Sequence, residues 1–171
     1  MTGTENISVS RGVRLTVGLL SLTAGLFWLL MNLSGVYPRD VFVGVALAGG
    51  GLVLLLWRRL PLSGRLVSAA AGVIGLGGTA AGLTARSAEI CCMFAYREGR
   101  GWPYEWLGRG AVAETPGEAQ RLAAAQGWEW SASALFVDVT VWAYAGLMVI
   151  VVGGLARRAA RRRAETTGPA V

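Results

Sequence analysis

Residues 134–156 read ALFVDVTVWAYAGLMVIVVGGLA, and the only charged side chain in this run is Asp138. A helix of about 20 apolar residues crosses the ~30 Å hydrocarbon core of a bilayer, so the run is long enough to span a membrane. Five arginines follow it directly, within residues 157–163. Arginines in this position are typical of the cytoplasmic side of a membrane helix. The sequence therefore predicts an integral membrane protein with a basic cytoplasmic tail at residues 157–171.

Three more apolar runs precede this one. Together the four runs predict transmembrane helices at about residues 13–36, 41–57, 66–90 and 134–156. The composition agrees, because 54% of the residues are hydrophobic and 15% are charged, whereas a soluble domain carries about 25% charged residues. We expect an all-α integral membrane protein, a single domain over residues 1–171. Its four helices form a bundle, and a long extracytoplasmic loop covers residues 91–131.

The positions of the arginines predict the orientation of the chain. Ten of them flank one set of helix ends: Arg11, Arg14, Arg58, Arg59, Arg65, Arg157, Arg158, Arg161, Arg162 and Arg163. Only Arg39 lies in the short turn at the opposite ends, so the positive-inside rule puts both termini in the cytoplasm, at the cell membrane. The net charge of +6 is thus distributed by membrane side. We expect the lipid bilayer as a partner and no nucleic acid.

Glycines are concentrated in the second and third predicted helices. The second contains Gly49, Gly50 and Gly51, and the third contains a GxxxG pair formed by Gly78 and Gly82. Small residues of this kind let membrane helices approach each other closely. Two interpretations stay open at this point. The glycine-rich faces of these two helices either serve packing within one chain, or they mediate homo-oligomerisation or the docking of a partner membrane subunit.

The predicted outer loop contains local signals of its own. Thr115, Pro116 and Glu118 form a capping box that predicts the start of a short helix, and Gly127 predicts its end. Four tryptophans flank this helix: Trp102, Trp106, Trp128 and Trp130. Tryptophan concentrates at membrane interfaces, so the four rings are typical of an aromatic belt. The alternative is a stacking platform for a sugar or a lipid headgroup.

Polar residues near the outer ends of the predicted helices suggest a cluster. Asp138 lies about four residues inside the fourth helix, and Arg86 lies near the outer end of the third. Glu89 follows Arg86 by three residues, on the same face of a helix, and Asn32 has a similar depth in the first helix. Charges at membrane depth pair or line an aqueous cavity. We therefore predict an Arg86–Asp138 ion pair with Glu89 and Asn32 beside it, which either locks two helices together or forms an outward polar pocket for a solute or protons.

Cys91 and Cys92 are the only cysteines, and the chain has no histidine. A structural zinc site needs four ligands, so we expect no metal and no other cofactor. A disulfide between neighbours is strained, which leaves ordinary buried or interfacial thiols, or an intermolecular disulfide. Four helices with an outward cysteine pair resemble, in outline, the quinone-coupled thiol oxidases of bacterial membranes. Those enzymes have two cysteine pairs, and this chain lacks the second pair that their relay needs.

The sequence contains no recognised catalytic motif. The favoured interpretation is a non-enzymatic accessory, scaffold or partner-binding protein of the membrane. An oligomeric small-solute transporter or channel is the alternative, although its charges would be confined to the outer edge of the helices. A further alternative is an enzyme that uses Cys91 and Cys92 on a thiol or lipid substrate.

Overall fold

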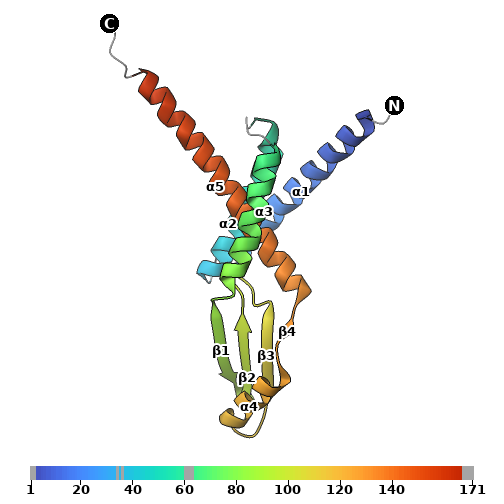
Figure 1. Cartoon of the computed structure of the whole chain (residues 1–171), viewed down its shortest axis with the longest axis vertical. Helices are drawn as coiled ribbons and strands as arrows, with labels where there is room; N and C mark the ends of the chain where they lie inside the picture. Colours follow the sequence, from blue (N-terminus) through green and yellow to red (C-terminus); the bar gives the residue numbers. More distant parts are fainter. Residues whose placement is uncertain (1–2, 34, 36, 60–63, 167–171) are drawn as a thin grey trace. The chain divides into compact units, whose positions relative to one another are not determined.

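The computed structural model describes residues 3–33, 35, 37–59 and 64–166. The chain forms two compact units, Met1–Gly72 together with Ala143–Val171, and Val73–Trp142. The first unit is helical, and the second combines helices with a sheet (Figure 1). The predicted end of the first transmembrane helix at Val36 and the last five residues of the tail lie outside the described residues.

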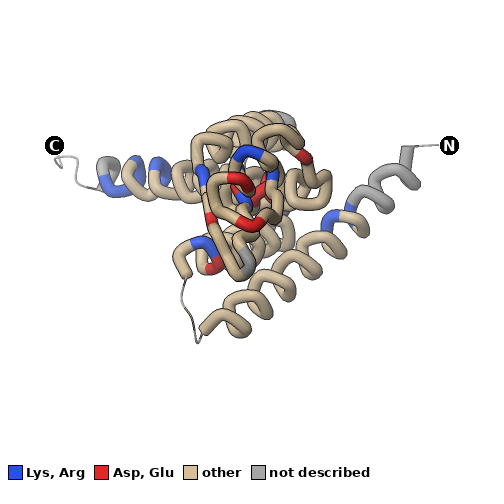
Figure 2. The backbone as a smooth tube through the Cα atoms, turned by 90° about the horizontal axis from the view of Figure 1, so that it is seen from below, with Lys and Arg blue, Asp and Glu red and all other residues tan. Residues whose placement is uncertain are grey.

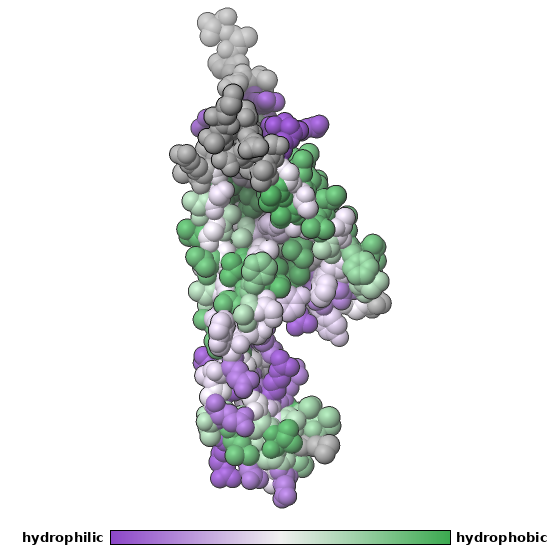
Figure 3. Space-filling view, turned by 90° about the vertical axis from the view of Figure 1, so that its right-hand side faces the viewer, coloured by the Kyte–Doolittle hydropathy of each residue, from purple (hydrophilic) through white to green (hydrophobic). Residues whose placement is uncertain are grey.

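Three long apolar helices dominate the chain. They are α1 (Gly3–Met31), α2 (Pro38–Leu56) and α5 (Ala132–Thr166). Among the described residues, the stretches long and apolar enough to cross a membrane are Arg11–Met31, Pro38–Arg59 and Ala132–Arg163. Helix α3 (Gly64–Gly82) contains a shorter apolar stretch, Val67–Gly82. Hydrophobic side chains, green in Figure 3, cover much of the helical surface seen there. The protein is thus mostly helical and compatible with a membrane location.

Glycines bring the helices of the first unit close together. A Cβ atom on Gly51 of α2 would lie 2.5 Å from the backbone nitrogen of Leu22 on α1. The ring of Tyr144 on α5 occupies the place where a Cβ atom of Gly50 would lie. The Tyr144 hydroxyl also shares a hydrogen bond of 2.7 Å with the hydroxyl of Ser21 on α1. The glycines of α2 therefore serve contacts within the chain, which need a surface without side chains.

The second unit contains a four-stranded antiparallel sheet. Its strands are β1 (Arg86–Cys91), β2 (Ala95–Arg100), β3 (Leu107–Val112) and β4 (Glu129–Trp130). They lie in the order β1-β2-β3-β4 (Figure 1). Helix α4 (Pro116–Gln126) connects β3 to β4, packs against β2 and β3, and buries Ala119 and Ala123. The hydroxyl of Thr115 caps this helix by accepting a hydrogen bond from the backbone nitrogen of Glu118 at 3.4 Å.

This sheet corrects two predictions. The fold is not all-α, and the third predicted helix does not continue to residue 90, because α3 ends at Gly82 and β1 begins at Arg86. The physical reason is strand pairing, since β1 forms a ladder with β2 in which Ala88 lies opposite Glu98. The chain reverses between them at Cys92–Phe94. The supposed outer loop, residues 91–131, therefore contains most of a folded sheet.

Candidate functional site

A cleft of ≈ 490 Å³ lies along β3 in the second unit. It is lined by residues 108–112 of β3, by residues 129–131, and by residues of β2 and the turn before β3. Strand β4 pairs with β3 only at Leu107 and Gly108. In the described part of the chain, the remaining four residues of β3 therefore have no strand partner on this side. We call this site the β3 cleft. Unpaired N–H and C=O groups on a strand edge are ready to pair with another chain.

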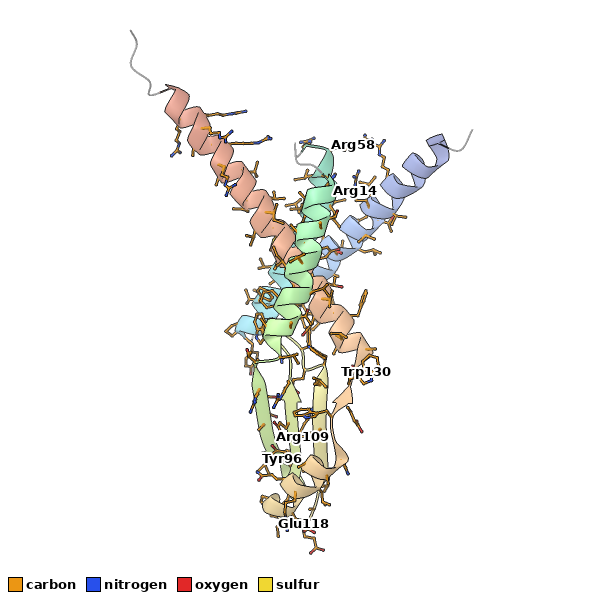
Figure 4. The ribbon with its side chains drawn as sticks, viewed as in Figure 1. Arg14, Arg58, Tyr96, Arg109, Glu118 and Trp130 are labelled. Atoms are coloured by element: carbon orange, nitrogen blue, oxygen red, sulfur yellow. The ribbon has the colours of Figure 1, made fainter. Side chains whose placement is uncertain are left out.

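The side chains around the β3 cleft include both apolar and charged groups. Val112 and Trp130 are 65% and 69% exposed, respectively. Arg97 of β2 forms an ion pair of 3.5 Å with Glu105, and Glu105 also accepts a hydrogen bond from the hydroxyl of Ser87 on β1. Figure 4 labels Trp130 at β4. The cleft thus has an apolar contact surface next to a fixed pair of charges.

A second cluster of charges holds β2 to β3. The Nε atom of Arg109 donates a hydrogen bond of 2.7 Å to Glu98, and the hydroxyl of Tyr96 donates one of 3.3 Å to the same carboxylate (Figure 4). The ring of Trp128 lies 4.6 Å from the guanidinium of Arg109 and 4.8 Å from that of Arg100. Cation–π contacts of this length are attractive. The cluster fastens the segment before β4 onto the sheet and supports one wall of the cleft.

Glu98 should make the stability of the sheet depend on pH. The hydrogen bond from Arg109 holds the pKa of the Glu98 carboxyl below its ordinary value of 4.5. A carboxyl whose pKa is lowered by folding stabilises the protein above its unfolded pKa, and this contribution is lost as the pH falls through the folded pKa. We expect Glu98→Gln to lower the unfolding temperature at pH 7. The difference from the wild type should shrink below about pH 4.5, and a difference that stays constant from pH 7 to pH 3 would contradict the assignment.

Asp138 has a different partner from the predicted one. Its side chain is fully buried, and its Oδ1 atom accepts a hydrogen bond of 3.0 Å from the backbone nitrogen of Tyr104. Arg86 lies exposed on β1, and no ion pair joins it to Asp138 among the residues that the structure describes. The predicted Arg86–Asp138 pair is therefore wrong. It assumed that helix α3 continues through Arg86, whereas the helix ends at Gly82.

The other members of the predicted polar cluster also have different surroundings. Arg86 and Glu89 are three residues apart on a strand, where alternate side chains point to opposite faces. Their side chains therefore do not share a face, as they would on a helix. Asn32 belongs to the first unit, and its amide donates a hydrogen bond of 2.8 Å to the backbone oxygen of Trp28.

Asp138 instead contributes to the attachment of the turn between β2 and β3. Next to it in α5, the indole nitrogen of Trp142 donates a hydrogen bond of 3.1 Å to the backbone oxygen of Trp102. The centroids of these two rings are 5.5 Å apart. Gly82 allows the backbone of Trp102 to approach α3, because a Cβ atom on Gly82 would lie 2.8 Å from that backbone oxygen. In the GxxxG pair of α3, Gly82 thus accommodates the turn, whereas Gly78 lies against the ring of Trp142 on helix α5.

The two cysteines lie at the turn between β1 and β2. Both are free and exposed, which does not agree with the interpretation as buried thiols. The hydrogen bond and the charge interaction with Cys92 raise the pKa of the Cys91 thiol. A raised pKa lowers the fraction of reactive thiolate at neutral pH. This environment is unlike that of a catalytic cysteine, which usually lies beside a positive charge.

Of the residues that line the β3 cleft, the sequence pointed only to Trp106 and Trp130, as members of the aromatic belt or stacking platform. The sequence does contain a signal for the two strands that line the cleft. The segments AYREGR (residues 95–100) and LGRGAV (residues 107–112) are both of strand length, and a turn with Gly101 and Pro103 separates them. Comparison with protein-family models, with curated proteins and with solved structures gives no match. The function is therefore inferred from the geometry of the chain itself.

Proposed function

We propose that this protein is a non-enzymatic, partner-binding protein of the cell membrane. In this proposal, the β3 cleft receives an extended segment of a partner protein. The observation that carries the proposal is the edge of β3 from Arg109 to Val112, which has no strand partner on the side of the cleft among the described residues. An added strand gains main-chain hydrogen bonds along such an edge, while neighbouring pockets select its side chains. Trp130 and Val112 offer apolar contacts, and Arg97 offers a charge.

The contacts of two acidic residues near the sheet, Glu98 and Glu105, favour binding over catalysis for these carboxylates. A general acid or base must be able to exchange a proton with a substrate. Glu98 is held by Arg109 and Tyr96, and Glu105 is held by Arg97 and Ser87. These contacts keep the two carboxylates in structural roles.

The proposal includes four transmembrane helices and an extracytoplasmic sheet. Helix α3 would be the fourth span, although its apolar stretch Val67–Gly82 is only ~24 Å long at 1.5 Å per residue. The support comes from the arginines, blue in Figure 2, which lie near the start of α1 and along the last part of α5. If α3 did not cross, the two ends of the chain would lie on opposite sides, and one arginine-rich end would be outside, against the positive-inside rule.

A photo-crosslinking amino acid at Val112 should identify the partner. Benzoylphenylalanine at this position should form one dominant covalent adduct in living cells, because the side chain is exposed at the cleft. Benzoylphenylalanine at Leu122 is the matched control, since Leu122 is an exposed apolar residue of α4 that does not line the cleft. Trp130→Ala should reduce the adduct several-fold, because contacts of a central aromatic side chain dominate many interfaces. Identification of the adduct by mass spectrometry completes the measurement.

Two results would contradict this proposal. Equal adducts from positions 112 and 122 would mean random collision, and an adduct that Trp130→Ala leaves unchanged would mean that the cleft is not used. A membrane-impermeant maleimide provides the control for sidedness, because Cys91 and Cys92 are both free and exposed. Both thiols should react in intact cells. Reaction only after the membrane is permeabilised would place the sheet in the cytoplasm.

A further inference from the structure

Arg14 lies in an apolar part of the first unit. It is the fourth residue of the apolar stretch Arg11–Met31 of α1, or ~4.5 Å from its end at 1.5 Å per residue. Its Nε atom is buried, and no described residue accepts a hydrogen bond from it. Arg14 also forms no ion pair with any of the described residues. Arg14 as a whole is half-buried, so the cost falls on this one atom, because a buried polar group without a partner is costly.

The side chain of Arg14 lines a second cleft, of ≈ 370 Å³. We call it the Arg14 cleft. Its other walls come from α2 and the turn after it, from the first part of α3, and from α5, and all of these belong to the first unit. They include Trp57, Ala71, Tyr144 and Leu147. The cleft therefore combines one guanidinium with a mainly apolar wall, in the size range of small-molecule sites.

The position of the Arg14 cleft matches the arginine-rich end of the helices. Arg58, at the turn after α2, lies toward the same end of this unit as Arg14 (Figure 4). Trp57 lines the cleft at that turn, and tryptophan is typical of the membrane–water interface. Basic pockets between transmembrane helices on the cytoplasmic side are typical sites for anionic lipid headgroups.

We propose that the Arg14 cleft binds an anionic phospholipid of the surrounding bilayer. The lipid phosphate accepts hydrogen bonds from the guanidinium of Arg14, and one acyl chain lies along the wall formed by Ala71 and Leu147. A phosphate supplies the negative charge and the acceptor that the chain does not provide to Nε. The apolar wall favours a lipid over a water-soluble phosphate, because only the lipid covers that surface. This inference does not use the β3 cleft, so the two proposals can fail separately.

The test measures lipid binding to the full-length protein in detergent. Native mass spectrometry and thermal shift would compare phosphatidylglycerol with phosphatidylcholine of the same acyl chains. The wild type should prefer phosphatidylglycerol by about tenfold, because the choline ammonium of phosphatidylcholine offsets the negative charge of its phosphate and weakens the attraction to the guanidinium. Arg14→Gln should abolish this preference. Arg11→Gln is the matched control, because Arg11 is an exposed arginine on the same helix that does not line the cleft, and it should keep the preference.

A second variant keeps the test valid if Arg14→Gln does not fold. Ala71→Leu fills the apolar wall and leaves Arg14 in place, so it should weaken binding of phosphatidylglycerol. Ala69→Leu is its control on the exposed surface of α3. Three results would overturn the proposal: equal losses for Arg11→Gln and Arg14→Gln, no preference in the wild type, or equal protection by glycerol phosphate, which would indicate a water-soluble ligand.

Discussion

Gly51→Leu is expected to separate α1 from α2 and to give the largest loss of stability in the first unit. A Cβ atom at residue 51 would lie 2.5 Å from the backbone nitrogen of Leu22 and 2.6 Å from the backbone oxygen of Gly18. Backbone atoms cannot move aside as a flexible side chain can, so the two helices must shift. Overpacking of this kind costs about 1–3 kcal/mol of unfolding free energy, and more where the backbone is displaced. Thermal unfolding of the purified protein in detergent measures the effect.

Gly153→Leu is the matched control for this prediction. Gly153 lies in the apolar stretch of α5, and outside its own turn of the helix no described atom lies within 4 Å of the place where its Cβ atom would be. The same change in residue type should therefore leave the unfolding temperature nearly unchanged. Similar losses for Gly51→Leu and Gly153→Leu would show that the close approach of α1 and α2 does not stabilise the protein.

Asp138→Leu is expected to give the second large effect, and Asp138→Asn a small one. Leucine removes the acceptor of the hydrogen bond from the backbone nitrogen of Tyr104. Loss of one partner in a buried hydrogen bond costs about 1–3 kcal/mol. Asparagine keeps an oxygen that can accept this bond, and its amide nitrogen takes the place of Oδ2, which has no hydrogen-bond partner among the described residues. Unfolding temperatures and hydrogen exchange of residues 101–106 measure both variants.

The comparison of these two variants separates a structural role for Asp138 from a role of its charge. If asparagine were as harmful as leucine, the negative charge itself would matter, as in an ion pair or a proton site. If leucine had no effect on unfolding or on exchange of residues 101–106, the hydrogen bond to Tyr104 would not hold the turn in place. A stable asparagine variant with an unstable leucine variant is the expected result.

The long apolar runs could be recognised without the structure, and the short segments between them could not. A run such as residues 134–156 has to be helical in a membrane, because each N–H and C=O group needs a partner within the segment. Residues 86–91 contain six residues with no clear period, and a short run of this kind does not distinguish a helix from a strand. Only their pairing with residues 95–100 makes them a strand.

The two candidate sites also depend on contacts between segments, which a continuous run of residues does not show. The β3 cleft exists because β4 pairs with only two residues of β3, and the extent of this pairing is a property of the folded sheet. The Arg14 cleft combines residues from four separate segments, so the sequence order does not bring them together. The sequence did draw attention to Asp138, since a lone charge in an apolar run is unusual.

By itself, the sequence determined the long apolar helices and the arginine-rich helix ends, because both follow from the composition of continuous segments. The tertiary structure alone decided that Asp138 binds the backbone of Tyr104 and that residues 86–112 form a sheet. It also decided that the glycines of α2 lie against α1 and α5. These are contacts between segments far apart in the chain, and their geometry depends on how those segments pack, which no local pattern of residues encodes.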